Sequence, residues 1–193
     1  MEQNTKPDDH PLYSQIQSTQ SNYYSEHGGK NTVFKKAQKF ECAETVCTQI
    51  PLLILMQKTF WIIPSRNQIY FEYPLFKMYA HPGNFMEITD YVINLCLQCK
   101  HMYNTFSLHV NFDGFTISAA ERYKQFVVWF NRVCETRNPG FTPVIETMIL
   151  YNTSNTMDHI STVFLPLIPH EMRPKIRIIG KEESAELLSQ LLA

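Results

Sequence analysis

Strands are predicted where apolar residues alternate with polar ones or gather in short aromatic and branched runs. Residues 106–112 alternate strictly, which is the pattern of a half-buried strand. Residues 59–63 and 68–73 flank a Pro-Ser-Arg-Asn turn, and they predict a β-hairpin. Residues 146–152 and 175–179 are two further runs of branched and aromatic residues and predict two more strands.

Between these strands, apolar residues recur every three or four positions, which predicts amphipathic helices. The helices cover residues 85–102, 157–168 and 182–192, and another opens at a Ser-Ala-Ala-Glu capping box that starts at Ser118. The predicted order over residues 59–193 is therefore ββαβαβαβα. This alternation favours an α/β domain with a mostly parallel sheet covered by helices.

The first 58 residues follow a different pattern. Residues 1–32 are dominated by Gln, Ser, Asn, Asp, Pro and Gly, and apart from Met1 their aliphatic residues are only Leu12 and Ile16. Such a segment buries too little surface to offset its ordering entropy, so a disordered tail is predicted. Residues 33–58 are predicted to form a short helical segment.

A basic face distinguishes this helical segment. Lys35, Lys36 and Lys39 share one side of the predicted helix, close to the apolar run 50–56. A basic amphipathic helix of this kind predicts weak, reversible contact with anionic lipids at a membrane surface. A membrane span needs about 20 apolar residues, so the run of seven is too short to cross.

Composition narrows the class of protein. The chain has 193 residues, of which 44% are hydrophobic, enough for one domain with a core. Its 17 basic and 18 acidic residues argue against nucleic-acid binding by broad phosphate neutralisation. Five cysteines without a signal-peptide pattern predict a reducing compartment and a cytoplasmic protein. Abundant Asn, Thr, Met and Tyr with few Gly suggest an AT-rich genome of the kind many viruses carry.

The sequence offers no recognisable catalytic constellation. Phosphate-binding glycine loops and the Gly-x-Ser-x-Gly elbow are absent, so an enzyme is disfavoured. Cys96 and Cys99 form a CxxC late in a predicted helix, where both belong to the buried face, and with Cys42 and Cys47 they do not match zinc-ligand spacing. His109 is interpreted as a half-buried, hydrogen-bonded strand residue. No cofactor or metal is predicted.

One segment remains open to two interpretations. Asn111, Asp113, Gly114 and Thr116 follow the predicted strand 106–112. They could form an ordinary βα turn in which Ser118 caps the next helix. They could also form part of a binding site, because open α/β sheets bind ligands at the carboxyl ends of their strands.

Two segments of the chain resemble a known family. FSLHVNFDGFTISAAERYKQF is similar to the central strand and turn of a CRAL-TRIO domain, with Asn111 where the family usually has Asp. Residues 146–192 resemble its later strand, gate helix, Lys-Ile strand and short helix. Asn152-Thr-Ser154 replaces the family's Asn-x-Pro turn, and Phe164-Leu-Pro-Leu167 replaces Phe-Lys-Pro-Phe.

The resemblance implies a module that holds a lipid or other hydrophobic ligand under the gate helix 157–168. The residues then expected to contact the ligand are Asn111, Tyr151, Met157, Ile160, Phe164 and Leu167. A divergent BCH-type branch of the family binds small GTPases and other proteins instead. Leu165 stands where lipid-transfer members carry a phosphate-contacting Lys, which favours that protein-binding alternative.

A weaker resemblance concerns STAS domains. These regulatory domains share the strand, turn and capped helix, and they are phosphorylated on a Ser in the first turn of that helix. Ser118 would be that position, although the family's Asp-Ser-Ser-Gly motif is absent.

Overall fold

The computed structural model describes residues 11–31, 33–137, 140–155 and 157–193. A five-stranded sheet runs through the molecule in the order β1-β2-β3-β4-β5. β1 is antiparallel to β2, and the other neighbours are parallel, which confirms the predicted α/β class with a mostly parallel sheet. The strands are β1 (Phe60–Ile62), β2 (Gln68–Glu72), β3 (Phe106–Asn111), β4 (Ile145–Thr153) and β5 (Ile176–Gly180).

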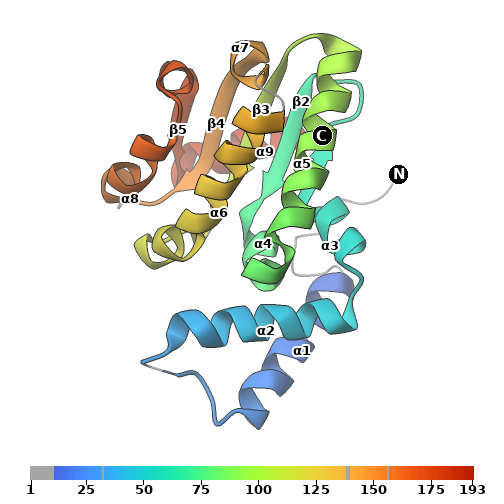
Figure 1. Ribbon diagram of the computed structural model, residues 1–193, viewed down its shortest axis with the longest axis vertical. Helices are drawn as coiled ribbons and strands as arrows, with labels where there is room; N and C mark the ends of the chain where they lie inside the picture. The colour runs from blue at the N-terminus through green and yellow to red at the C-terminus, as the bar shows by residue number, and fades with distance from the viewer. Residues whose placement is uncertain (1–10, 32, 138–139, 156) are drawn as a thin grey trace.

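The α-helices of the described residues connect and cover these strands (Figure 1). They are α1 (Pro11–Glu26), α2 (Lys35–Gln49), α3 (Leu52–Thr59), α4 (Tyr73–Tyr79), α5 (Phe85–Tyr103), α6 (Ile117–Arg137), α7 (Phe141–Val144), α8 (Met157–Phe164) and α9 (Lys181–Leu192). Short 3-10 turns lie at Pro82–Asn84, Leu165–Leu167 and His170–Lys175.

Different helices pack on the two faces of the sheet. Successive parallel strands are added on the same side, so right-handed crossovers place α5 and α6 on one face, in front of the sheet in Figure 1. On that face Phe106 packs with Cys96 and Cys99, which confirms the interpretation of these cysteines as core residues. On the other face Tyr70 and Tyr151 pack against α9.

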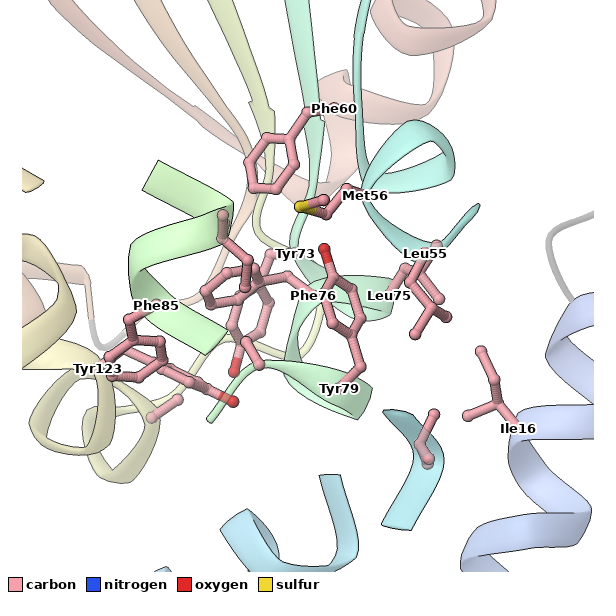
Figure 2. Close-up of a cluster of buried hydrophobic side chains, with 14 of the residues drawn as sticks. Ile16, Leu55, Met56, Phe60, Tyr73, Leu75, Phe76, Tyr79, Phe85 and Tyr123 are labelled. Atoms are coloured by element: carbon pink, nitrogen blue, oxygen red, sulfur yellow. The ribbon is translucent and has the colours of Figure 1, made fainter. Parts of the chain in front are cut away.

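The largest cluster of buried side chains lies where α4 and α6 meet the helices that precede the sheet. Figure 2 shows Phe76 and Tyr79 of α4 at its centre, with Phe85 and Tyr123 to one side. Ile16 of α1 closes the opposite end. The helix α4 was not predicted, because its run of aromatic residues continues the pattern of the strand before it.

The structure corrects the prediction of a disordered tail for residues 11–26, which form α1. Although most residues of this helix are polar, three side chains on one side point into the protein. Leu12, Ile16 and Tyr23 are buried, and Ile16 is 0% exposed. Tyr23 also donates a hydrogen bond of 2.8 Å to Glu41 on α2. Three well-placed anchors thus order a helix whose other residues remain polar. Residues 1–10 of the predicted tail lie outside the described residues.

The start of α2 also differs from expectation. The helical segment was predicted to start at residue 33, but the helix begins at Lys35, and Val33 and Phe34 before it are 78% and 69% exposed. Asn31 turns the chain here by accepting hydrogen bonds from their backbone N–H groups at 2.8 and 2.9 Å.

The start of α6 corrects the predicted capping box. The helix begins at Ile117, so Ser118 lies exposed in its first turn. Thr116 is the capping residue, because its hydroxyl accepts a 3.2 Å hydrogen bond from the backbone N–H of Ala119. The predicted helix 157–168 is likewise shorter: α8 ends at Phe164 and continues as a 3-10 turn through Pro166.

Candidate functional site at the carboxyl edge of the sheet

Three polar side chains meet where β2, β3 and β4 end. Glu72 and Asn111 are paired across neighbouring strands. The Asn111 amide nitrogen donates to both Glu72 carboxylate oxygens, at 3.0 and 3.1 Å. The Asn152 amide nitrogen donates in turn to the Asn111 oxygen at 2.8 Å. One amide side chain therefore joins the ends of three strands.

Further contacts connect this polar cluster to the surrounding turns. Tyr70 donates its hydroxyl to Glu72 at 2.8 Å. The Asn111 oxygen also accepts the backbone N–H of Asp113 at 3.0 Å, which forms the tight turn before α6. Asp113 pairs at 3.5 Å with Lys181 at the start of α9. The predicted βα turn is therefore present, and Asn111 organises it.

Gly114 completes this turn with a φ of +68°. The backbone conformation strains any other residue at this position, and an added Cβ would also come within 2.9 Å of the Lys77 ammonium, which would have to move. The same ammonium lies 5.6 Å from the centre of the Tyr73 ring. A cation is thus held directly over the turn.

Burial dominates the electrostatics of the polar cluster. Desolvation raises the pKa of Glu72, while the hydrogen bonds from Asn111 and Tyr70 oppose that rise. Desolvation also raises the pKa of Tyr70, which keeps the phenol protonated as a donor. Glu72 is therefore a carboxylate that is hydrogen-bonded within the protein and that fixes the ends of the strands.

His109 lies on the same face as Tyr70, in the middle of β3. Its Nδ1 is 2.9 Å from the Tyr151 hydroxyl, and its Nε2 is buried without a hydrogen-bond partner. Burial lowers the pKa of His109 to about 4, so the ring is neutral at physiological pH. The predicted hydrogen-bonded histidine is confirmed, and at 4% exposure it is more deeply buried than expected.

The residues predicted to line a ligand pocket are only partly brought together. Ile160 is 1% exposed and packs into the main core, where half-buried Met157 and Phe164 join it. Tyr151 faces α9 on the opposite side of the sheet, and Asn111 belongs to the polar cluster. Leu167 is half-buried, and its carbonyl accepts a hydrogen bond from Asn131 of α6.

Hollows lie elsewhere on the described surface. One open hollow of about 490 Å³ lies beside α1, and another of about 380 Å³ lies at the end of α5. Neither of these two hollows is lined by residues of α8. Among the described residues no group of three or more His, Cys, Asp or Glu side chains could hold a metal ion. Nor does any described helix combine the length and apolar character needed to span a bilayer.

The predicted membrane-contact lysines lie exposed on α2. Phe40 on the other side of this helix packs 6.1 Å from Tyr123 of α6. Desolvation and the charge of Arg122 lower the pKa of Lys39, so α2 brings this lysine close to α6. The charge of Lys35 contributes to the same effect.

Sequence reasoning missed Glu72 and Arg122. Glu72 ends a run of aromatic strand residues, and the polar last residues of successive parallel strands could have indicated the polar cluster. Arg122 carries no such signal, because the sequence pattern shows it as an ordinary charge on a helix, although it is buried.

Comparisons with known proteins identify a distant likeness in structure but no match in sequence. No family model and no curated protein matches the sequence. Among solved structures, the crystal structure of Sfh5, a Sec14/CRAL-TRIO family protein, is similar to this chain with a TM-score of 0.48 and 10% identity. The match covers 91% of this chain and 69% of that one. A likeness at this level says nothing about ligand or activity.

Proposed function

We propose that the protein is a non-enzymatic binding module that takes a lipid or other hydrophobic ligand between α8 and the rings beneath it. The observation that carries the proposal is an aromatic group that α8 only partly covers. Phe115 stacks on Phe112 at 4.5 Å, meets Tyr73 at 4.7 Å and reaches Phe164 of α8 at 5.9 Å. Phe112 and Phe164 are half-buried, so the group meets solvent at its edge.

The helix α8, which covers this aromatic group, is short enough to move. α8 spans eight residues, whereas α5 and α6 span 19 and 21. A helix of this length depends on tertiary contacts for its stability, and Ile160 is its one fully buried anchor among the described side chains. Displacing Phe164 would give an acyl chain or ring system an apolar surface without unfolding the sheet.

The alternative is a protein-interaction module with a permanently filled interior. The observation that favours it is the packing of Ile160, which leaves 1% of this residue exposed beneath α8. In this case the outer surface would bind a protein partner and the interior would only support it.

Mass spectrometry of the purified full chain, native and after solvent extraction, separates these functions. A stoichiometric apolar molecule, or saturable uptake of oleate by the empty protein, supports the binding module. An empty chain that takes up no oleate supports the interaction module.

Two charged substitutions on adjacent residues locate the site. Phe164→Asp should reduce oleate uptake at least about tenfold, because a carboxylate in the aromatic group is costly to desolvate. Leu165→Asp, a matched control at an exposed position, should leave uptake unchanged. Phe164→Ala is a control for misfolding of the Asp variant. It enlarges the apolar site without adding charge and should keep oleate uptake. Equal loss in Phe164→Asp and Leu165→Asp would place the ligand elsewhere.

A further inference from the structure

Two adjacent apolar side chains are exposed in the turn between α1 and α2. Val33 is 78% exposed and Phe34 is 69% exposed, more than any other large apolar residue in the described part of the chain. Figure 1 shows this turn at the margin of the molecule, on the side away from the sheet. Single apolar residues on a surface are common, but an adjacent pair on a protruding turn indicates contact with an apolar partner. Val33 and Phe34 are named the apolar tip.

Hydrogen bonds hold the backbone of the apolar tip in one shape. The Asn31 side chain accepts the N–H groups of Val33 and Phe34 at 2.8 and 2.9 Å. Gln38 of α2 fastens the other side of the turn, because its oxygen accepts the Asn31 N–H at 2.6 Å and its nitrogen donates to the Gly29 carbonyl at 2.8 Å. The apolar tip is therefore exposed by a defined turn, and docking need not first order this segment.

Positive charge flanks the apolar tip on both sides. Lys30 precedes it, Lys35 and Lys36 follow it, and all three side chains are exposed. The ion pairs recorded within the described residues join other parts of the molecule and include none of these lysines. Residues 26–41 as a whole carry four lysines and two glutamates, so the turn has an excess of positive charge.

The position of this charge does not serve the helix that follows. α2 begins with Lys35 and Lys36, its first turn has no acidic residue, and Phe34 at its N-cap offers no side-chain hydrogen bond. The dipole of a helix favours acidic residues at this end and disfavours lysines. Because the sequence gives up helix stability here, a role outside the helix is favoured for these two charges.

We infer that the apolar tip inserts into the surface of a membrane that carries anionic lipids. Val33 and Phe34 reach the boundary between headgroups and acyl chains, while the flanking ammonium groups stay among the lipid phosphates. The small size of the tip selects this partner. A stable protein interface buries about 1,200–2,000 Å² in total, far more than two side chains supply, whereas insertion into a bilayer needs no matching surface.

The insertion site differs from the membrane contact that the sequence predicts through the apolar run 50–56. That run follows the other end of α2, about 22 Å along the helix from Lys35. Its residues Leu53 and Ile54 are also exposed, at 53% and 45%, and so provide a matched control pair. The apolar tip is also separate from the site proposed beneath α8, so either can fail without the other.

Sedimentation of the full chain with vesicles tests the insertion. The vesicles are phosphatidylcholine alone and phosphatidylcholine containing one-fifth phosphatidylserine, and the wild type should bind the second kind, more weakly as salt is added. The double variant Val33→Ser with Phe34→Ser should weaken binding at least about tenfold, and it should keep its fold and its oleate uptake because both side chains are exposed. Leu53→Ser with Ile54→Ser should leave vesicle binding within about twofold.

A charge reversal and a fluorescent probe give independent measurements. Lys36→Glu should weaken binding about tenfold, and Lys58→Glu, an exposed lysine of α3, should change it less than about twofold. Phe34→Trp should emit at shorter wavelength when phosphatidylserine vesicles are added, after subtraction of the wild-type emission from Trp61 and Trp129.

Three results would overturn the insertion of the apolar tip. The first is absence of binding to phosphatidylserine vesicles, and the second is equal loss in the two double Ser variants. The third is self-association of the wild type in sedimentation velocity that the Val33→Ser, Phe34→Ser variant lacks, since the partner of the tip would then be a second copy of the chain. Binding that depends on the tip, together with the shift of the Phe34→Trp emission, supports the proposal.

Discussion

Replacing Asn111 by Asp gives a sharp test of the polar cluster, because it changes one atom and very little volume. In the native protein the Asn111 nitrogen lies 3.0 and 3.1 Å from the two Glu72 oxygens. An oxygen in its place turns two hydrogen bonds into contacts between acceptors. The Asn152 and Asp113 N–H groups that donate to the other Asn111 oxygen keep their acceptor.

The magnitude follows from the charges. Two carboxylates about 4 Å apart repel by about 4 kcal/mol at an effective dielectric constant of about 20, so one of them retains a proton. A carboxyl group with an ordinary pKa of about 4 that must stay protonated costs about 1.4 kcal/mol for each pH unit by which the solution lies above that pKa. The hydrogen bond that the shared proton makes between the two carboxyl groups offsets part of this cost. We expect Asn111→Asp to lower the free energy of unfolding by about 3 kcal/mol at pH 7.

The pH dependence has a definite sign. The folded state of the variant holds a proton that its unfolded state releases above pH of about 4, so the loss of stability grows as pH rises. At pH 5 the loss should shrink to about 1 kcal/mol. Urea unfolding at pH 5 and pH 7, compared with the wild type at each pH, measures both values.

A matched control lies at the other end of the sheet. Asn67 donates to the exposed Glu146 at 3.5 Å, so Asn67→Asp creates the same pair of carboxylates in water. This control should change the free energy of unfolding by less than about 0.5 kcal/mol at either pH. An Asn111→Asp effect of equal size at pH 5 and pH 7 would refute the coupling to Glu72.

Two further predictions concern His109 and the start of α6. Because burial lowers the pKa of His109 to about 4, the unfolded chain binds more protons at this residue below pH of about 6.5, and His109 should account for a loss of about 2 kcal/mol of stability between pH 7 and pH 5. His109→Gln should lack this loss in urea titrations; an unchanged pH slope would contradict the assignment. Thr116→Ala should destabilise the protein by about 1 kcal/mol and Ser118→Ala by less than about 0.5 kcal/mol, and the reverse order in thermal unfolding would restore Ser118 as the cap.

Periodicity predicted the strands and the long helices of the sheet domain because their burial is local and repetitive. It failed for α1, where the few inward positions are spread among polar residues. It failed for α4 because an aromatic run is equally consistent with the end of a strand. The helix there begins at Tyr73 with Pro74 in its first turn, where the missing N–H costs nothing.

The candidate sites depended more strongly on tertiary arrangement. Asn111 could be singled out from its place at the end of a strand, but its partner Glu72 is defined by the register of β2 against β3. The resemblance led to grouping Tyr151 with Phe164 as pocket residues, whereas strand alternation directs Tyr151 to the opposite face. Arg122 appears in the pattern as an ordinary helix charge, yet the structure buries it.

The sequential strand order has a consequence for how the chain acquires its fold. Each strand pairs with its neighbours in sequence, so a sheet emerging from the ribosome can grow by one strand at a time with little loop entropy to overcome. The face bearing Tyr70 and Tyr151 must wait for α9, which is tied back by the Arg66 side chain donating to the Leu191 carbonyl, 125 residues away. Nascent chains lacking α9 should therefore expose an aromatic surface, and this is the stage at which a chaperone would recognise them.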